Sequence, residues 1–350
     1  MSLQIEKAKS HKITEALEKE ILNGNLKPGA RIQSVRSLAE KFSVSIKVIQ
    51  IVFDALEKKN LIERRHGSGT FVREIKFSPK NRIAFLFLAS RSIEESYHFQ
   101  VFRGISNELQ RNGYSVDLTM EYDNEELVNN YSGIVFSSTI SHDTIKKVMK
   151  TGLPCVVYGN VTGIKGLCEV NPDYYNGSMA AVDYLCKFNY NKIVFVKVST
   201  EFNKRNQVCY EGYLAGLRKN GFTAHPELEW EFSEIDDKID MMKDELKTGN
   251  YAFYIPNDAT AFDISARLKK YGIKAGVNTS IVSFYNRNYA QFANPALTTI
   301  GFDHELMGRI LAQKLCKIIS GKKADSELIP IELILRQSVC NPQNHLIEEI

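Results

Sequence analysis

The chain has 350 residues, of which 43% are hydrophobic and 25% are charged, a composition typical of a globular protein. No apolar stretch approaches the roughly 20 residues that a membrane-spanning helix needs, and the first residues lack the apolar core of a secretory signal. These features exclude a membrane partner and argue against export. We therefore expect a cytoplasmic protein with two domains.

The charge is distributed unevenly along the chain. Residues 1–72 hold 13 Lys and Arg against 8 Asp and Glu, whereas the remainder holds 32 against 33. A small basic domain attached to a larger, near-neutral one indicates a polyanionic partner for the small domain alone. On charge alone, a basic surface that only contacts solvent is as good an explanation as a surface that binds a polyanion.

No motif predicts a catalytic centre. The six cysteines lack CxxC spacing and lie mostly within apolar patterns, so we expect reduced core thiols without disulfides or bound metal. Ser141, His142 and Asp143 are consecutive and cannot fold back as a catalytic triad without a special loop. The common phosphate-binding and zinc-peptidase motifs are missing as well, so we expect neither a cofactor nor an enzyme.

Three amphipathic helical patterns occupy the first sixty residues. Gly24 is placed to end the first helix, while Ser34 and Ser45 are placed to cap the second and the third. The third helix thereby turns Lys47 and Gln50 outward. The apolar faces consist of Ile13, Leu17 and Ile21 in the first helix, Val35, Leu38, Ala39 and Phe42 in the second, and Ile49, Val52, Phe53 and Leu56 in the third.

A hairpin pattern follows these helices. The runs LIERR and TFVRE are β-patterned, and they flank the turn HGSG, whose glycines permit positive φ angles. Three helices followed by a hairpin predict a winged helix-turn-helix.

The stretches ILNGNLKPGARIQSVRSLAEKFSVS and LEKKNLIERRHGSGTFV resemble the GntR-family winged helix, over residues 13–72. The resemblance implies that the helix after Ser45 enters the major groove of DNA and that the hairpin tip lies at the minor groove. It also implies that Arg36 and the helix N-termini hold phosphates. Carried over by position, the DNA-facing residues are Ser34, Arg36, Ser45, Lys47, Gln50, His66 and Gly67.

The recognition helix departs from the family pattern. Gln33 stands where the family usually has proline, and Ile46, Val48 and Gln50 stand where it often has arginine, threonine and arginine. Glutamine pairs with adenine and apolar side chains contact the thymine methyl, so we expect an operator richer in A·T pairs. The alternative is a domain that no longer binds DNA, although Arg36 and the GSG of the wing are intact.

Residues 73–82, REIKFSPKNR, mix charge with Ser-Pro and read as a linker. Beyond it, short apolar runs such as IAFLFLA, GIVFSS, PCVVYG, IVFVKV, YAFYI and SIVSF alternate with amphipathic stretches. This alternation predicts parallel sheets with helical crossovers. Helices are expected at residues 99–111 and 179–188.

The same region is similar to the periplasmic-binding-protein-like effector domain of LacI-type repressors. The similarity lies in FRGISNELQRNGY, GSMAAVDYLCKFNYNKIVFV, EGYLAGLRKNG, PNDATAFDISARL and PALTTIGFDHELMG, in that order. It implies two Rossmann-like lobes between which the chain crosses more than once, with a ligand at the carboxyl ends of the strands. The expected fold class is therefore α/β, with an N-terminal winged helix-turn-helix before this two-lobed domain.

The resemblance also implies which residues bind the effector. Aromatic side chains would stack on a sugar face, and amide or carboxylate groups would bind its hydroxyls. Cys209 occupies the family's arginine position, for which Arg205 is a substitute, and Tyr285 occupies that of an aspartate. The expected effector-binding residues are Tyr97, His98, Gly159, Asn160, Arg205, Asn257, Asp258, Tyr285, Asn286 and Phe302.

These observations predict a transcriptional regulator that binds operator DNA as a homodimer and responds to a small carbohydrate. We expect a DNA-binding domain at 1–76, a linker at 77–81, an effector-binding and dimerisation domain at 82–342 and a tail at 343–350. Two alternatives compete: a GntR-type pyridoxal-phosphate aminotransferase, for which the remaining chain is short, and a sugar-binding protein without DNA. The direction of regulation stays open.

Overall fold

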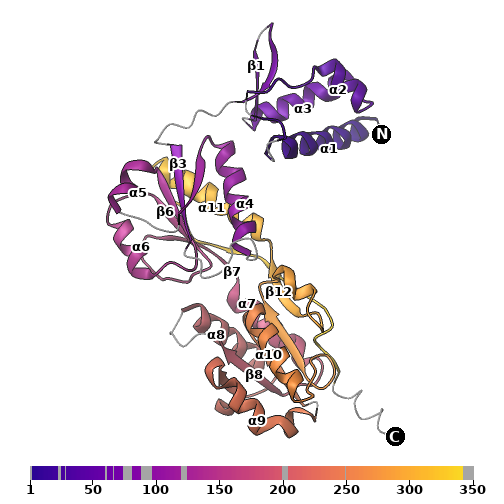
Figure 1. Cartoon of the computed structure of the whole chain (residues 1–350), viewed down its shortest axis with the longest axis vertical. Helices are drawn as coiled ribbons and strands as arrows, with labels where there is room; N and C mark the ends of the chain where they lie inside the picture. Colours follow the sequence, from indigo (N-terminus) through magenta and orange to yellow (C-terminus); the bar gives the residue numbers. More distant parts are fainter. Residues whose placement is uncertain are drawn as a thin grey trace.

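The computed structural model describes residues 2–22, 25–27, 29–59, 61–65, 67–73, 81–87, 97–119, 124–198, 204–248 and 250–341. Three bodies follow one another along the long axis of the molecule, a small helical body and two α/β lobes (Figure 1). No helix within the described ranges is long and apolar enough to cross a membrane.

The N-terminal body is a winged helix, as the sequence predicts. Its buried apolar side chains form a cluster of their own that includes Ile13, Leu17, Ile49, Val52 and Phe53. Because its apolar core is separate from those of the lobes, this body has its own source of stability. It consists of α1 (Ser2–Leu22), α2 (Val35–Lys41), α3 (Ile46–Lys58), β1 (Ile62–Arg65) and β2 (Gly69–Val72), the two strands being antiparallel.

The first lobe is a six-stranded sheet in the order β13-β7-β6-β5-β3-β4, and every neighbouring pair is parallel. Its central strands are buried along their whole length because helices cover both faces of the sheet. The lobe contains β3 (Arg82–Leu86), α4 (Tyr97–Arg111), β4 (Ser115–Thr119), α5 (Asn124–Asn130), β5 (Gly133–Phe136), α6 (His142–Met149), β6 (Cys155–Tyr158), β7 (Cys168–Pro172), α11 (His304–Ile319) and β13 (Glu327–Ile329).

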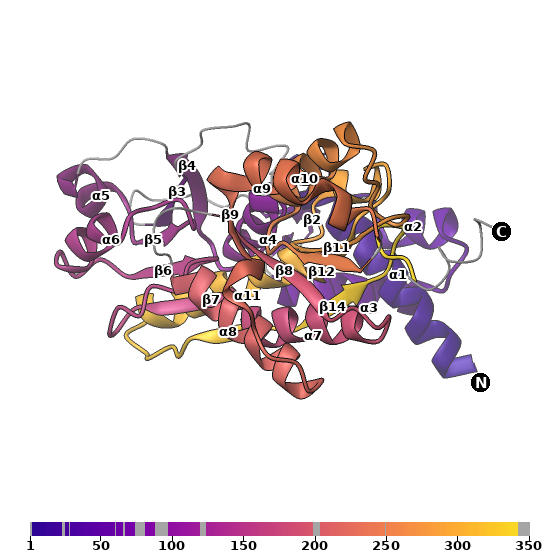
Figure 2. The same cartoon turned by 90° about the horizontal axis from the view of Figure 1, so that it is seen from below.

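The second lobe repeats this plan in the order β14-β12-β11-β10-β8-β9, with α7 and α8 on one face of the sheet and α9 and α10 on the other (Figure 2). Strand β14 runs antiparallel to β12, unlike the all-parallel pairing that the alternating pattern predicts. The lobe contains α7 (Tyr174–Cys186), β8 (Lys192–Lys197), α8 (Lys204–Lys219), β9 (Glu229–Glu231), α9 (Ile235–Leu246), β10 (Tyr251–Tyr254), α10 (Asp258–Lys270), β11 (Ser280–Phe284), the short 3-10 helix η4 (Asn288–Gln291), β12 (Thr298–Phe302) and β14 (Ile331–Ile334).

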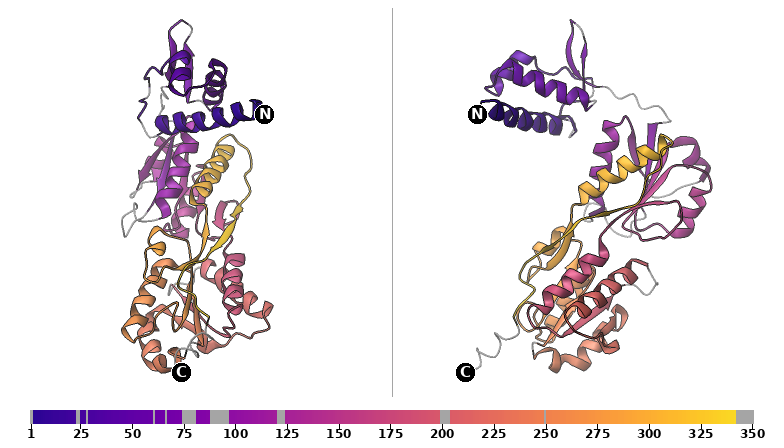
Figure 3. Two further views of the ribbon diagram at one scale, coloured as in Figure 1. Left: turned by 90° about the vertical axis from the view of Figure 1, so that its right-hand side faces the viewer. Right: turned by 180° about the vertical axis from the view of Figure 1, so that it is seen from behind.

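The chain crosses between the lobes after β7, after β12 and after β13, which confirms the predicted multiple crossing. The lobes lie one beyond the other along the long axis, and the winged helix lies beyond the first lobe (Figure 3). The carboxyl ends of β7 and β12 lead directly into α7 and α11. Side chains at these strand ends therefore meet between the lobes.

Two glycines let α4 and α11 approach closely. A Cβ atom at Gly104 would collide with the backbone carbonyl of Glu305, and one at Gly308 would collide with that of Val101. The only side chain small enough at both positions is hydrogen. This contact packs the first half of α4 against the start of α11 and so positions the start of α4, where Tyr97 and His98 lie.

A buried carboxylate of the winged helix contacts the first lobe. Glu18 of α1 accepts a hydrogen bond from Lys59 at 2.5 Å and pairs with Arg111, the last residue of α4. Burial would raise the pKa of Glu18, but Lys59 and Arg111 outweigh it and hold the pKa below its ordinary value. Arg111 also pairs with Glu108 at 3.2 Å. Helix α4 therefore reaches from the region between the lobes to the winged helix.

Candidate DNA-contacting surface and inter-lobe site

Two serines cap the helices of the helix-turn-helix. The Ser34 hydroxyl accepts the backbone N–H of Ser37 at 3.2 Å, and the Ser45 hydroxyl accepts that of Val48 at 3.4 Å. Both helices have the capping residue that the sequence predicts. The turn between them passes through Ser43, whose φ of 50° lies in the left-handed region. The remaining N–H groups at these helix starts are available to a phosphate.

The outer face of α3 is exposed over two turns. Lys47 and Gln50 are both exposed, as predicted, and Ile46 and Ile51 beside them are 48% and 42% exposed. Val48 is different, because it is only 2% exposed and belongs to the core of the winged helix. Of the two apolar residues at this helix start, Ile46 is exposed enough for the thymine contact expected from the sequence, and Val48 is not.

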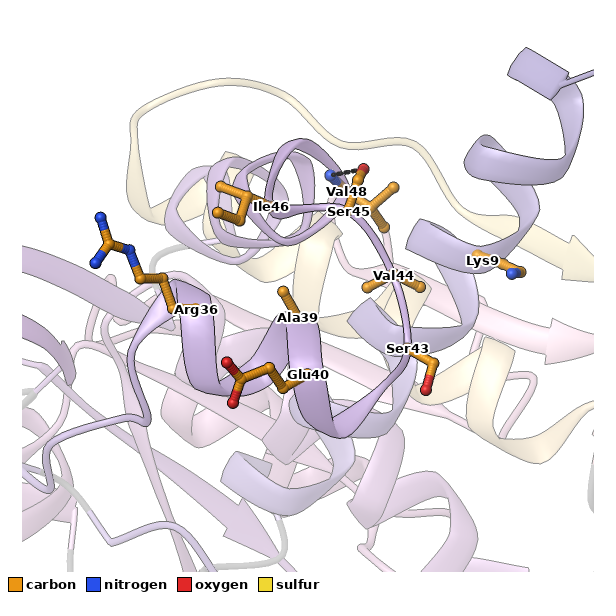
Figure 4. Close-up of a pocket in the computed structure, with 9 residues that line it drawn as sticks. All are labelled: Lys9, Arg36, Ala39, Glu40, Ser43, Val44, Ser45, Ile46 and Val48. Carbon is orange, nitrogen blue, oxygen red and sulfur yellow. Dashed lines mark hydrogen bonds between the residues drawn. The ribbon is translucent and has the colours of Figure 1, made fainter.

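A groove of about 570 Å³ lies beside α3, between α1 and α2 (Figure 4). It is lined at one end by Arg36 and at the other by Lys9, with Ser43 and Ser45 between them. Arg36 is exposed. The groove thus joins two cations and one carboxylate, Glu40, to the capped start of α3, and its net positive charge suits a phosphate backbone.

The wing holds its shape through glycine and charge. Gly67 has a φ of 71°, the left-handed conformation for which the sequence suggests glycine at the hairpin turn. His66, predicted at the same tip, lies outside the described residues. Next to the tip, the Arg65 guanidinium lies 4.6 Å from the centre of the Phe71 ring, while Arg64 pairs with Asp54 of α3 at 2.5 Å. The hairpin is therefore braced against the recognition helix.

An aromatic cluster lies between the lobes, at the carboxyl ends of the strands. Tyr97 of the first lobe stacks on Tyr285 of the second with ring centres 5.2 Å apart, and Phe302 packs edge-on against both. The Tyr174 hydroxyl lies 3.4 Å from the Tyr285 hydroxyl. Tyr97, Tyr174 and Tyr285 are each less than 5% exposed. Flat, apolar faces with polar edges therefore meet at the junction between the lobes.

The backbone is strained where Tyr285 leaves β11. Tyr285 has a φ of 104° and the next residue, Asn286, one of 49°, values that side-chain-bearing residues rarely adopt. Arg336 donates to Asn286 Oδ1 at 2.6 Å, and Tyr285 N donates to the Ile300 carbonyl at 2.8 Å. Such strain persists only where the surroundings impose it, and it concentrates at functional sites.

Two guanidinium groups lie on Tyr285. Arg205 donates from Nη1 to the Tyr285 hydroxyl at 2.9 Å. Arg287 lies with its guanidinium carbon 5.6 Å from the centres of both the Tyr97 and the Tyr285 rings. The junction between the lobes is therefore both aromatic and positively charged.

Two buried histidines border the cluster. His98 shares a hydrogen bond of 2.7 Å with the Tyr158 hydroxyl, and His304 Nδ1 donates to Gln100 Oε1 at 2.9 Å. Burial lowers the pKa of His98 to about 3, with a further contribution from Arg287, and burial lowers that of His304 to about 4. Both imidazoles are neutral at pH 7.

Asn257 and Asp258 have structural contacts at the start of α10. Asn257 Oδ1 accepts the N–H groups of Ala259 and Thr260, and so caps the helix. Asp258 is fully buried, and its carboxylate accepts from the Ser283 and Thr299 hydroxyls and from the backbone N–H of Arg287. These contacts hold the strained Tyr285–Arg287 segment in place. Their oxygens are thus already engaged in the protein.

The loop after β6 reaches the same cluster. Gly159 has a φ of 67°, and a Cβ atom there would lie 2.9 Å from the Tyr97 hydroxyl. Asn160 faces away, with its Oδ1 atom 3.4 Å from His142 Nε2. Its backbone carbonyl accepts a hydrogen bond from the Asn171 side chain. Glycine at position 159 therefore leaves room for Tyr97, while Asn160 joins a neighbouring polar network.

Six of the predicted effector-binding residues come together in this cluster: Tyr97, His98, Gly159, Arg205, Tyr285 and Phe302. Sequence reasoning missed Tyr158, Tyr174, Arg287 and His304 in this cluster. Arg287 was detectable, because it follows Tyr285 and Asn286 at the same strand end. Tyr158 lies inside the apolar run PCVVYG, which predicts only core, and Tyr174 lies in the polar stretch NPDYYN, which carries no signal of a site.

Two family models match the chain. Residues 9–72 match the bacterial regulatory proteins of the gntR family, and residues 182–339 match the periplasmic binding protein-like domain. The chain therefore joins a gntR-type helix-turn-helix domain to a periplasmic binding protein-like domain, and both domains are those that the sequence predicts. The predicted α/β fold class, with two lobes after an N-terminal winged helix, is confirmed as well.

Relatives of this regulator span most of its length. The HTH-type transcriptional repressor PurR of Pasteurella multocida is 23% identical over 336 residues, covering 87% of this chain and 98% of the relative. The arabinose metabolism transcriptional repressor of Geobacillus stearothermophilus is 24% identical, covering 91% and 94%. A solved complex of the transcriptional regulator CelR with cellobiose superposes with a TM-score of 0.66 at 17% identity, covering 85% of this chain and 92% of that one. The predicted class, a DNA-binding transcriptional regulator, is confirmed.

Proposed function

We propose that this regulator binds a two-fold symmetric operator as a homodimer in the cytoplasm, and that a sugar or sugar derivative bound between the lobes controls it. Residues 1–76 act as the DNA-binding domain, 77–81 as the linker, 82–342 as the effector-binding and dimerisation domain and 343–350 as the tail. The outer face of α3 reads bases and the groove beside it holds phosphates.

The observation that supports the effector site is the strained Tyr285–Asn286 pair. Two successive positive φ angles cost free energy, and the hydrogen bonds of Asp258 and Arg336 hold them in place. The result is that Tyr285 faces Tyr97 of the other lobe. Tyrosine rings facing each other across a junction suit the flat faces of a sugar ring. The cellobiose bound to the structurally similar CelR supports the same ligand class.

The α4 helix offers a route between the two sites. Tyr97 lies at its first residue and Arg111 at its last, where Arg111 pairs with Glu18 of the winged helix. Fifteen residues of α-helix span about 22 Å. A change in lobe closure that moves Tyr97 would therefore shift a rigid element that contacts the DNA-binding domain.

A thermal-shift screen of sugars on the full chain tests the effector site, because a ligand that binds only the folded state raises the melting temperature. For any sugar that stabilises the protein, Tyr285→Ala should weaken binding by at least about tenfold and leave basal operator affinity unchanged. Phe292→Ala is the matched control, since Phe292 is a 79% exposed aromatic residue of the same lobe.

The same sugar should change operator affinity in a gel-shift assay, and by linkage operator DNA should change sugar affinity by the same factor. Equal binding of the sugar by wild type and Tyr285→Ala would show that the effector site lies elsewhere.

A further inference from the structure

Arg287 has an unoccupied hydrogen-bonding edge. Its Nη1 lies 3.4 Å from the Tyr289 hydroxyl, and its guanidinium stacks on Tyr97 and Tyr285. Its Nε is buried, yet no described residue accepts a hydrogen bond from it. None accepts one from Nη2 within the described ranges either. The Nε–Nη2 edge is the one that binds a carboxylate or a phosphate through two parallel hydrogen bonds.

The structure supplies no anion for this edge. The carboxylate of Asp258 contacts Arg287, but it accepts the backbone N–H at 2.7 Å and not a guanidinium N–H. Its other oxygen accepts from Ser283 at 2.5 Å and Thr299 at 2.8 Å. Among the described residues, no carboxylate accepts a hydrogen bond from the Arg287 guanidinium. Asp258 binds the backbone of Arg287, and its charge interacts with the guanidinium without direct contact.

The other groups that face Arg287 are neutral or cationic. They are the tyrosines Tyr97 and Tyr285, the histidines His98 and His304 and, through Tyr285, a second cation, Arg205. The Arg287 side chain is half-buried, but its Nε is buried without an acceptor among the described residues, and an unmade hydrogen bond there costs free energy that an accepting ligand recovers. An anionic group accepts from Nε and Nη2 at once and is also attracted by both cations, Arg287 and Arg205.

We propose that the effector carries an anionic group, a carboxylate or a phosphate, and that Arg287 binds this group through Nε and Nη2. This inference rests on the proposed function, because it assigns a ligand class to the same inter-lobe site. Tyr97 and Tyr285 bind the remainder of the molecule by stacking, so the ligand is a sugar acid or a sugar phosphate and not a neutral sugar.

The test uses the full chain and a bacterial small-molecule extract that an anion-exchange resin has divided into a retained, anionic fraction and an unretained fraction. Wild type, Arg287→Gln and Arg218→Gln are compared by thermal shift with each fraction. Arg218 is an exposed arginine in the last turn of α8, so Arg218→Gln removes the same charge away from the junction. Phosphatase treatment of the retained fraction then distinguishes a phosphate ester from a carboxylate.

The retained fraction should raise the melting temperature of wild type and of Arg218→Gln. Arg287→Gln should need at least about tenfold more of this fraction for the same rise, because it loses a charge-assisted hydrogen bond to the ligand. Loss of the shift after phosphatase treatment identifies a phosphate, and its survival identifies a carboxylate. Stabilisation by the unretained fraction alone, equal in wild type and Arg287→Gln, would overturn the anionic ligand and leave the proposed effector control intact. If neither fraction stabilises any of the three proteins or alters operator binding, effector control itself fails.

Discussion

The winged helix and the inter-lobe site are built in opposite ways. In the winged helix, the candidate DNA-contacting residues are exposed and come from one continuous stretch, and local caps at Ser34 and Ser45 position them. Between the lobes, the candidate effector residues are buried, come from strand ends far apart in the sequence, and depend on strained backbone at Tyr285. A surface that must meet DNA tolerates substitution one residue at a time, whereas the inter-lobe site couples binding to the stability of the lobes.

The largest expected effect is on stability and comes from Asp258→Ala. This change leaves the Ser283 and Thr299 hydroxyls and the Arg287 N–H buried without an acceptor, so the free energy of unfolding should fall by about 3 kcal/mol. Urea denaturation of the full chain measures it. Asp303→Ala is the control, because Asp303 is an exposed carboxylate that caps α11, and its removal should cost only about 1 kcal/mol. Equal losses for the two variants would remove the distinction between the buried carboxylate and an ordinary cap.

Acidification should destabilise the lobes. His98 and His304 have pKa values lowered to about 3 and about 4, whereas an unfolded histidine titrates near 6.5. The unfolded state therefore binds more protons below pH 6.5, so this stability is fully present above pH 6.5 and is lost as the pH falls toward 4. From pH 7 to pH 5 each histidine should cost about 2 kcal/mol.

Urea denaturation of His304→Gln at pH 7 and at pH 5 measures how much of the stability lost on acidification comes from His304. The variant should lose less stability on acidification than wild type, while His225→Gln, which changes an exposed histidine, should behave like wild type. Parallel pH profiles for His304→Gln and wild type would mean that His304 is not buried in the neutral form.

Base readout should change with Gln50→Arg. Gln50 is exposed on α3 and suits adenine, whereas arginine suits guanine, so one position in each half-site should shift from adenine toward guanine by about 1–3 kcal/mol. Selection of binding sites from a random oligonucleotide pool measures the shift. An unchanged motif would show that Gln50 does not contact a base edge.

Arg36→Ala should produce the smallest effect, a loss of DNA affinity that does not depend on the DNA sequence. Because Arg36 lines the groove at the start of α3 and is expected to hold a phosphate, its loss should weaken all sequences alike and reduce the salt slope by about 1. Titrations at several salt concentrations, with two unrelated operator sequences, measure both quantities. A change in sequence preference would instead place Arg36 on a base.

The contrast between the two regions also explains what the sequence could predict. Short-range signals, such as the caps at Ser34 and Ser45 and the apolar runs of β5, β6 and β11, predict the winged helix and the central strands. The antiparallel β14 was not predicted, because its direction depends on a return from the other lobe. The roles of Tyr158, which ends an apolar run, and of Tyr174, which lies in a polar stretch, could not be predicted, since their burial and hydrogen bonding depend on partners distant in the chain.

Val48 shows the same limit on a smaller scale. Its position relative to the family pattern suggested a base contact, but the packing of α3 turns it into the core at 2% exposure. Helical periodicity places a residue on a face, and tertiary packing decides how wide the buried face is.

The division of labour between the two regions is the central claim, and one comparison tests it directly. Operator affinity is measured by titration at several salt concentrations for residues 1–76, residues 81–350 and the full chain. Residues 1–76 carry the basic excess and their own apolar core, so they should bind DNA with strong salt dependence, while residues 81–350 should not bind at all. Salt-dependent operator binding by residues 81–350 would contradict the account.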